Sequence, residues 1–144
     1  MLYETDEQKV SLEKEIEYLR SYIDLQKQRF GSQVKVNVEV RPADKSYEIE
    51  PMLLISFVEN AFKHGTGIIE APQIDIQLSA INDELEFSVA NKYNPKTEET
   101  KDHTSGIGLS NVKRRLNLLY RNNYSLKITN ESDWFRILLR IKLQ

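Results

Sequence analysis

Hydrophobic residues recur every three or four positions in three segments of the chain, which is the spacing of one face of an α-helix. The first segment predicts a helix to about Phe30, with Ser11 as its N-cap. The second predicts a helix that opens at Pro51, where a missing N–H costs nothing, and stops at Gly65. The third predicts a helix that follows Gly108. The apolar stripes of the first and third helices are Leu12, Ile16, Leu19 and Ile23, and Leu109, Val112, Leu116 and Leu119.

Other segments alternate hydrophobic and polar residues, as half-buried β-strands do. This pattern predicts strands at residues 34–40, 74–78, 85–89, 126–128 and 135–141. Asn82 and Asp83 form a turn between the second and third strands, and the last two strands form another hairpin. Hairpins imply antiparallel pairing. The expected fold is therefore α/β (α+β), a two-layer sandwich in which a mixed, mostly antiparallel sheet carries helices on one face.

The helix predicted to begin at Pro51 has one apolar and one polar face. Residues three and four apart are neighbours on a helix, so Ser56, Glu59, Asn60 and Lys63 share the polar face, opposite Leu54, Phe57, Val58 and Ala61. The Asn60 carboxamide oxygen is a hard ligand suited to Mg²⁺. Glu59 is suited to orient or deprotonate a water or hydroxyl, and Lys63 to neutralise a phosphate. The plainer interpretation is a solvated helix face.

A second group of interest is the segment Gly106-Ile107-Gly108-Leu109-Ser110-Asn111, which follows a polar stretch and leads into the third helix. Glycines at a helix N-terminus let backbone N–H groups approach an anion, which the helix dipole also favours. The alternative is a flexible loop before an ordinary helix. Neither a dinucleotide fingerprint nor a P-loop is present, which disfavours both of those folds.

Composition narrows the possible functions further. The chain has 144 residues, of which 40% are hydrophobic, as expected for one soluble domain with a real core. A net charge of −2 argues against nucleic-acid binding. No apolar run approaches the ~20 residues needed to span a bilayer, and no secretory signal pattern opens the chain. Because the chain has no cysteine, disulfides and thiolate chemistry are excluded.

The two motifs, in this order, resemble those of a known superfamily. Val-Glu-Asn-Ala-Phe-Lys-His-Gly at residues 58–65 resembles the N box of the histidine kinase branch of the GHKL ATPases, and Gly-Ile-Gly-Leu-Ser-Asn-Val-Lys-Arg-Arg-Leu at 106–116 resembles its second glycine box. The flanking segments 12–30 and 49–51 are similar to the catalytic region of LytS-type sensor histidine kinases. The resemblance covers about residues 10–144.

The resemblance implies that ATP and Mg²⁺ bind here, between the helices and a polar lid at residues 92–105. Asn60 would ligate Mg²⁺, Glu59 would polarise the reacting groups, and Lys63 with His64 would contact phosphate. The second glycine box would wrap the triphosphate, with Gly106, Ile107, Gly108, Leu109 and Asn111 as its binding residues. These assignments make Glu59, Lys63 and His64 the catalytic residues.

Asn91 marks a departure from the family pattern. The family's first glycine box normally has an Asp after a strand, which accepts a hydrogen bond from the adenine amino group. Here Asn91 stands in its place, and the glycines of that box are absent. An Asn carbonyl can accept from the amino group while its NH₂ donates to the neighbouring ring nitrogen. A variant adenine site at Asn91 is therefore expected, although a regulatory module that has lost catalysis remains an alternative.

The expected phosphoacceptor histidine is not in this chain. Its two histidines, His64 and His103, are not placed on the upstream dimerisation helix where the family carries the acceptor. The chain is thus interpreted as a single catalytic domain at residues 11–144 of a cytoplasmic region, after a linker remnant at residues 1–10. The resemblance implies two partners: the upstream dimerisation helices of a homodimeric, membrane-anchored parent, and a response regulator, which in this family is often of the LytTR type. A serine kinase of the anti-sigma-factor kind is the alternative within the superfamily, and the first helix disfavours it.

Overall fold

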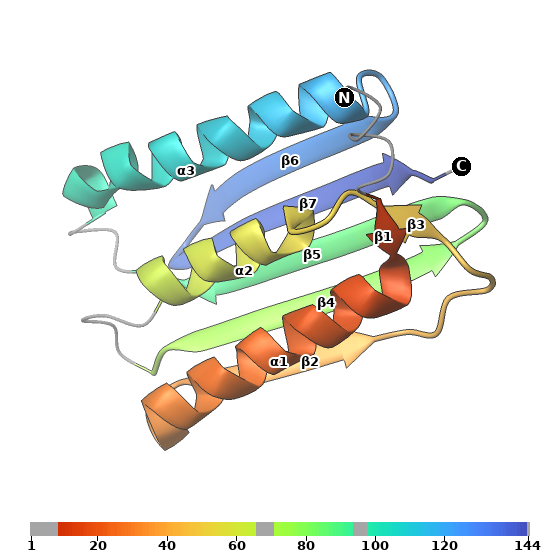
Figure 1. Cartoon of the computed structure of the whole chain (residues 1–144). Coiled ribbons are helices and arrows are strands. Elements are labelled where there is room, and N and C mark those ends of the chain that lie inside the picture. The colour runs from red at the N-terminus through yellow and green to blue at the C-terminus, as the bar shows by residue number, and fades with distance from the viewer. Residues whose placement is uncertain (1–8, 66–70, 94–97, 144) are drawn as a thin grey trace, which may run out of the picture.

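The computed structural model describes residues 9–65, 71–93 and 98–143, with the backbone alone for residues 98–108. Three α-helices lie on the same side of a five-stranded sheet (Figure 1). The elements in chain order are β1 (Val10–Ser11), α1 (Leu12–Phe30), the 3₁₀ helix η2 (Gly31–Gln33), β2 (Lys35–Val40), β3 (Glu48–Ile49), α2 (Leu53–His64), β4 (Gln73–Ile81), β5 (Glu84–Lys92), α3 (Glu98–Leu119), β6 (Tyr124–Glu131) and β7 (Trp134–Lys142). The predicted two-layer fold is confirmed.

The sheet has the strand order β2-β4-β5-β7-β6. Only β2 and β4 pair in parallel, and the other neighbours are antiparallel. The turn between β4 and β5 is Asn82–Asp83, as predicted, and both residues have the positive φ of a tight hairpin turn. The short strands β1 and β3 form a separate antiparallel pair that the sequence pattern did not predict.

The core lies between the helices and the inner face of the sheet. Alternate residues of β4 and β5 are buried there, and the Phe57 ring of α2 lies 6.3 Å from the Phe87 ring of β5, centroid to centroid. Ser11 caps α1 as predicted, because its side chain accepts a hydrogen bond from the Lys14 backbone N–H. The apolar stripe of α1 therefore packs inward.

Two predicted helix starts are wrong. The helix α2 begins at Leu53, because Met52 adopts a left-handed backbone with φ 63° and so breaks the helix at its first expected turn. The helix α3 begins at Glu98, so Gly106 and Gly108 lie inside it, and the part of the expected lid at residues 98–105 is helical. Each interior glycine costs only about 1 kcal/mol of helix stability, and acidic residues such as Glu98 and Glu99 suit a helix start. Of the remaining expected lid residues, Lys92 is the last residue of β5, Tyr93 follows it, and 94–97 lie outside the described residues.

The end of α3 also differs from the prediction in one position. Leu119 is 38% exposed, and the core position one turn beyond Leu116 is taken by Tyr120, which is buried. An ideal helix has 3.6 residues per turn, so a residue four positions after Leu116 can share its buried face while the residue three positions after it lies to one side.

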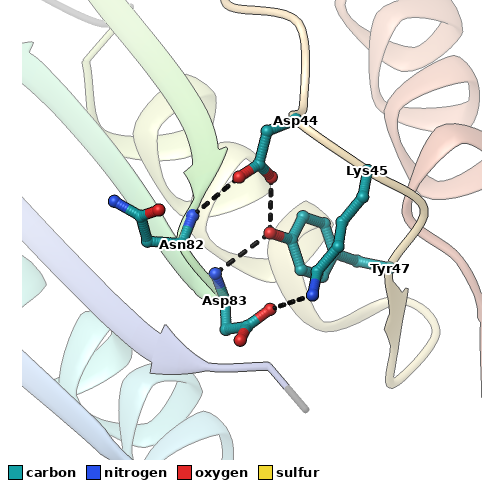
Figure 2. Close-up of polar contacts among 5 residues, drawn as sticks. All are labelled: Asp44, Lys45, Tyr47, Asn82 and Asp83. Atoms are coloured by element: carbon teal, nitrogen blue, oxygen red, sulfur yellow. Dashed lines mark hydrogen bonds and ion pairs between the residues drawn. The ribbon is translucent and has the colours of Figure 1, made fainter.

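The hairpin between β4 and β5 is held by the segment that connects β2 to β3 (Figure 2). The Asp44 carboxylate accepts from the Asn82 backbone N–H at 3.0 Å and from the Tyr47 hydroxyl at 2.5 Å. The Tyr47 hydroxyl accepts in turn from the Asp83 backbone N–H at 3.0 Å, and Lys45 pairs with the Asp83 carboxylate at 2.7 Å. These contacts fix the end of the sheet at which β4 turns into β5.

This cluster predicts a pH dependence of stability. The Asn82 backbone N–H, followed by the Tyr47 hydroxyl, lowers the pKa of Asp44 below its ordinary value of 3.8. A depressed folded-state pKa adds stability above the unfolded value, and that stability is lost as the pH falls through the folded one. We therefore expect Asp44→Asn to destabilise the domain at pH 7 and progressively less below about pH 4, as measured by urea unfolding. Equal pH slopes for Asp44→Asn and the exposed control Asp24→Asn would contradict this assignment.

Candidate functional site

A groove of about 310 Å³ lies between α2 and α3 and contains most of the predicted site residues. The side chains that line it are Ser56, Glu59, Asn60, Lys63 and His64 from α2 and Leu109, Asn111, Val112 and Arg115 from α3. Six of the ten site residues predicted from sequence line this groove: Glu59, Asn60, Lys63, His64, Leu109 and Asn111. A larger groove, of about 690 Å³, lies between α1 and the β2–β4 edge, away from these residues.

The wall formed by α2 follows from its two faces. Leu54 and Phe57 are fully buried against the sheet, which turns Glu59 and Lys63 outward to solvent and leaves Asn60 half-buried. His64, in the last turn, is only 6% exposed, and a basic side chain is favourable there because of the helix dipole. The arrangement places a carboxylate, a carboxamide and an ammonium on one side of the groove.

Glu59 also has an aromatic neighbour on α1. Burial, followed by the negative charge of Glu59, raises the pKa of the Tyr22 phenol, so Tyr22 stays neutral at pH 7. The Tyr22 ring meets Phe62 edge to face, with the ring centroids 6.1 Å apart. Thus α1 packs against the helix that carries the polar wall.

The wall formed by α3 combines apolar and basic groups. Leu109 and Val112 are buried, Asn111 is exposed and Arg115 is half-buried. One Arg115 guanidinium nitrogen, Nη2, donates to the Pro51 carbonyl at 3.1 Å. Arg115 was not among the predicted site residues, because a basic residue after the glycines does not by itself indicate which direction its side chain takes.

The glycine segment does not form the predicted open anion site. Gly106, Ile107 and Gly108 lie on the backbone of α3, where each N–H in a helix interior bonds to the carbonyl four residues earlier. A helix N-terminus is where N–H groups are free to bind an anion, and that terminus is at Glu98. The glycine backbone can therefore contact a phosphate only if this part of α3 unwinds.

Asn91 lies at the end of β5, beneath the C-terminal end of α2, and does not line the groove. It is 2% exposed, and its Nδ2 donates to the Lys92 carbonyl at 2.9 Å. A Cβ atom added to Gly65 would lie 2.8 Å from the Asn91 Cβ and 3.1 Å from its Nδ2. The absence of a side chain at Gly65 is what lets the N box approach this strand.

We expect Gly65→Ala to destabilise the domain by about 1–3 kcal/mol. The new methyl group would also meet the Ala61 carbonyl oxygen at 2.8 Å, and neither neighbour can move without shifting backbone. Urea unfolding measures the loss. Gly31→Ala is a useful comparison, because nothing lies within 4 Å of its added Cβ and only its positive φ opposes the change. If Gly65→Ala were as stable as the unchanged protein, the close approach of α2 to β5 would be wrong.

Sequence comparisons connect this fold to known proteins. A family model for histidine kinases matches residues 1–34. The sensor histidine kinase BtsS of Escherichia coli (strain K12) is 29% identical over 137 residues, which cover 92% of this chain and 24% of BtsS. The sensor protein LytS of Enterococcus faecalis is 26% identical over 132 residues, which cover 84% of this chain and 22% of LytS. The chain thus spans about a quarter of the length of these curated relatives.

Structure comparisons agree on the fold. The catalytic domain of the histidine kinase ThkA superposes with a TM-score of 0.65 at 18% identity, over 93% of this chain and 95% of that one. ThkA in complex with the response regulator protein TrrA gives a TM-score of 0.66 at 18% identity, over 94% of this chain and 42% of that one.

The chain is thus similar in sequence to sensor histidine kinases, and it has the fold of histidine kinase catalytic domains. LytS is among its relatives, which confirms the resemblance to LytS-type sensor kinases that the two motifs indicate. In the part of the chain that the structure describes, no helix is both long and apolar enough to cross a membrane.

Proposed function

We propose that this domain binds ATP and Mg²⁺ in the α2–α3 groove and donates the γ-phosphoryl group to a histidine on an upstream domain. The observation that carries the proposal is the lining of the groove, where Glu59, Asn60 and Lys63 face Asn111 across a space of about 310 Å³. That volume lies at the lower end of small-molecule sites. Catalysis of this transfer is mainly positioning and charge neutralisation.

The residues present suit Mg²⁺. Asn60 offers a hard oxygen ligand inside the groove, and among the described residues no three His, Cys, Asp or Glu side chains gather as a metal cluster. One oxygen ligand is enough for Mg²⁺, which usually takes one or two protein ligands and completes its shell with water and substrate phosphates. Bound Mg²⁺ would neutralise charge on the phosphates.

The other groove residues have separate roles in this proposal. Glu59 orients the reacting groups, while Lys63 and His64 hold phosphate oxygens at the C-terminal end of α2. Asn111 and the backbone from Gly106 to Leu109 close on the triphosphate. Because that backbone belongs to α3, binding unwinds its glycine segment, which the two glycines make less costly.

The surrounding protein follows from the same proposal. We assign residues 11–144 to one catalytic domain and residues 1–10 to a linker from upstream dimerisation helices, in a homodimeric parent anchored in the membrane. The ThkA structure contains the response regulator TrrA, which supports a response regulator as the downstream partner here. Its output domain in this system is expected to be of the LytTR type.

A regulatory binding module is the second candidate function. The observation in its favour is that the Asn91 carboxamide, the expected adenine contact, already donates to the Lys92 carbonyl. A titration with ATP, with and without Mg²⁺, separates the two. The kinase proposal expects saturable binding that Mg²⁺ strengthens, and a complete absence of binding would favour the regulatory module.

The adenine assignment makes a prediction of its own. Asn91→Ala should weaken ATP binding by on the order of 1–3 kcal/mol, because the adenine edge loses its paired hydrogen bonds, and should affect GTP less. Competition titrations of ATP against GTP measure the preference. Asn91→Asp is the matched control, since a carboxylate can still accept from the adenine amino group. An unchanged ATP-to-GTP preference in Asn91→Ala would show that Asn91 does not contact the base.

A further inference from the structure

The three residues before α2, Glu50, Pro51 and Met52, form a strap whose backbone is bound by side chains from the neighbouring helices. The Glu50 N–H donates to the hydroxyl of Tyr120, directly after α3, at 3.1 Å. The Pro51 carbonyl accepts from Arg115 of α3 at 3.1 Å. The Met52 N–H donates to Oε1 of Glu15 of α1 at 3.2 Å. The strap is therefore held from both sides.

Met52 itself is strained. Its φ of 63° lies in the left-handed region, which a non-glycine residue occupies only where its surroundings hold it. Its side chain is 46% exposed, so side-chain packing does not supply that restraint. The hydrogen bonds to the strap backbone supply the restraint on Met52. The N-cap residue of α2, Met52, has no side-chain hydrogen bond that caps the helix, and the bonds to the strap take the place of that cap.

Glu15 is an unusual residue for a core position. It is 4% exposed, and burial raises its pKa above the ordinary 4.5, while backbone N–H groups of Met52 and Leu54 and the charge of Arg115 act in the opposite direction. A carboxyl whose folded-state pKa is raised stabilises the fold at low pH and loses that contribution as the pH rises through the folded pKa. Burial therefore works against the ionised form of Glu15, and the hydrogen bond to Met52 offsets only part of that cost.

The strap connects to both walls of the groove. The Ser56 hydroxyl, one turn into α2, donates to the Met52 carbonyl at 3.4 Å, and Glu59 and Asn60 lie one further turn along the same helix. On the other side, Arg115 both binds the strap and lines the groove. A displacement of the strap therefore moves the polar wall of α2 relative to α3.

We propose that Glu15 is a positioning residue for nucleotide binding, which acts through Met52 and the strap to set the α2 wall against Arg115. This rests on the nucleotide-binding function proposed above. Glu15 lies on α1, and among the described residues it is not part of the groove lining. The orientation of α1, the helix that enters from the upstream side, is thereby linked to the geometry of the groove.

The first test compares Glu15→Leu with Glu15→Gln. Leucine fills the buried space without an acceptor, and we expect Mg²⁺–ATP affinity to fall by about tenfold while the domain stays folded. Glutamine keeps an oxygen for the Met52 N–H and should restore affinity to within about twofold. Amide hydrogen exchange should quicken at Met52 and Leu54 in Glu15→Leu, but not at Val58. Glu17→Gln, an exposed glutamate on the same helix, is the matched control.

The second test uses Arg115→Lys, which keeps the charge but not the planar donor group that reaches Pro51. We expect it to weaken Mg²⁺–ATP binding about fivefold, and to add nothing when combined with Glu15→Leu, because both act through one strap. The exposed Arg114→Lys serves as its control. If Glu15→Leu does not fold, the Mg²⁺–ATP affinities of Glu15→Gln and Arg115→Lys test the positioning role in its place.

The outcomes separate the two proposals. If the unchanged protein fails to bind Mg²⁺–ATP, the proposed function is wrong, and the positioning role falls with it. Binding by the unchanged protein and equally by Glu15→Leu would overturn the positioning role alone. The positioning role would also be overturned if the losses of affinity in Glu15→Leu and Arg115→Lys multiplied in the double variant.

Discussion

Asn60→Ala is expected to remove the Mg²⁺-dependent part of ATP binding and to leave the domain folded. Asn60 is half-buried on the groove face of α2, so the core does not depend on it, and alanine is the best helix former. Loss of the carboxamide oxygen removes the proposed metal ligand, which should cost about tenfold or more in affinity. Titrations with ATP in the presence and absence of Mg²⁺ measure the difference.

Two variants control this experiment. Asn60→Asp supplies a carboxylate oxygen, which Mg²⁺ also prefers, and should preserve the metal dependence. Asn130→Ala removes an exposed asparagine on β6 and should change nothing. If Asn60→Ala bound ATP with undiminished Mg²⁺ dependence, the ligand assignment would be refuted. If it unfolded, Asn60 would have a structural role instead.

The largest expected effect concerns phosphoryl transfer itself. The chain alone should bind ATP without becoming stably phosphorylated, because the proposed function places the acceptor histidine on the upstream helices. His64 is 6% exposed in the last turn of α2, and His103 lies in the part of α3 described by its backbone alone. Holding an acceptor in attack geometry is worth roughly 7–11 kcal/mol of the barrier. Adding the native upstream helices should therefore produce labelling from radioactive ATP.

The control for this experiment is the same helices with their acceptor histidine replaced. They should dock without restoring the label, which separates acceptor chemistry from a general effect of the added segment. Strong acid-labile labelling of the present chain, mapped to His64 or His103, would show that the acceptor has been misplaced.

The fold was largely predictable because its signals are local. Ser11 caps α1 through a residue three positions away, and Asn82–Asp83 makes a two-residue turn between alternating strands. The polar wall of α2 was predictable for the same reason, since residues three and four apart share a helix face.

The features that sequence reasoning missed depend on distant contacts. Glu15 looks like any charged helix residue, yet it is buried because it reaches the Met52 N–H, 37 positions away. Arg115 reaches Pro51 across 64 positions. The glycines of α3 favour the end of a loop when only neighbouring residues are considered, but the helix continues through them. In each case tertiary contacts or helix continuation overrode the local pattern.

The parallel pairing of β2 with β4 sets an order for folding. Lys35 pairs with Gln73 across a stretch of chain that contains β3 and α2, whereas β4–β5 and β6–β7 close through tight turns. Local pairings form faster than distant ones, because less chain entropy is lost before contacts are made. β2 is also one of the two edge strands, and its valines are only half-buried, which favours local opening there. The topology therefore favours early formation of the two hairpins and later pairing of β2 with β4.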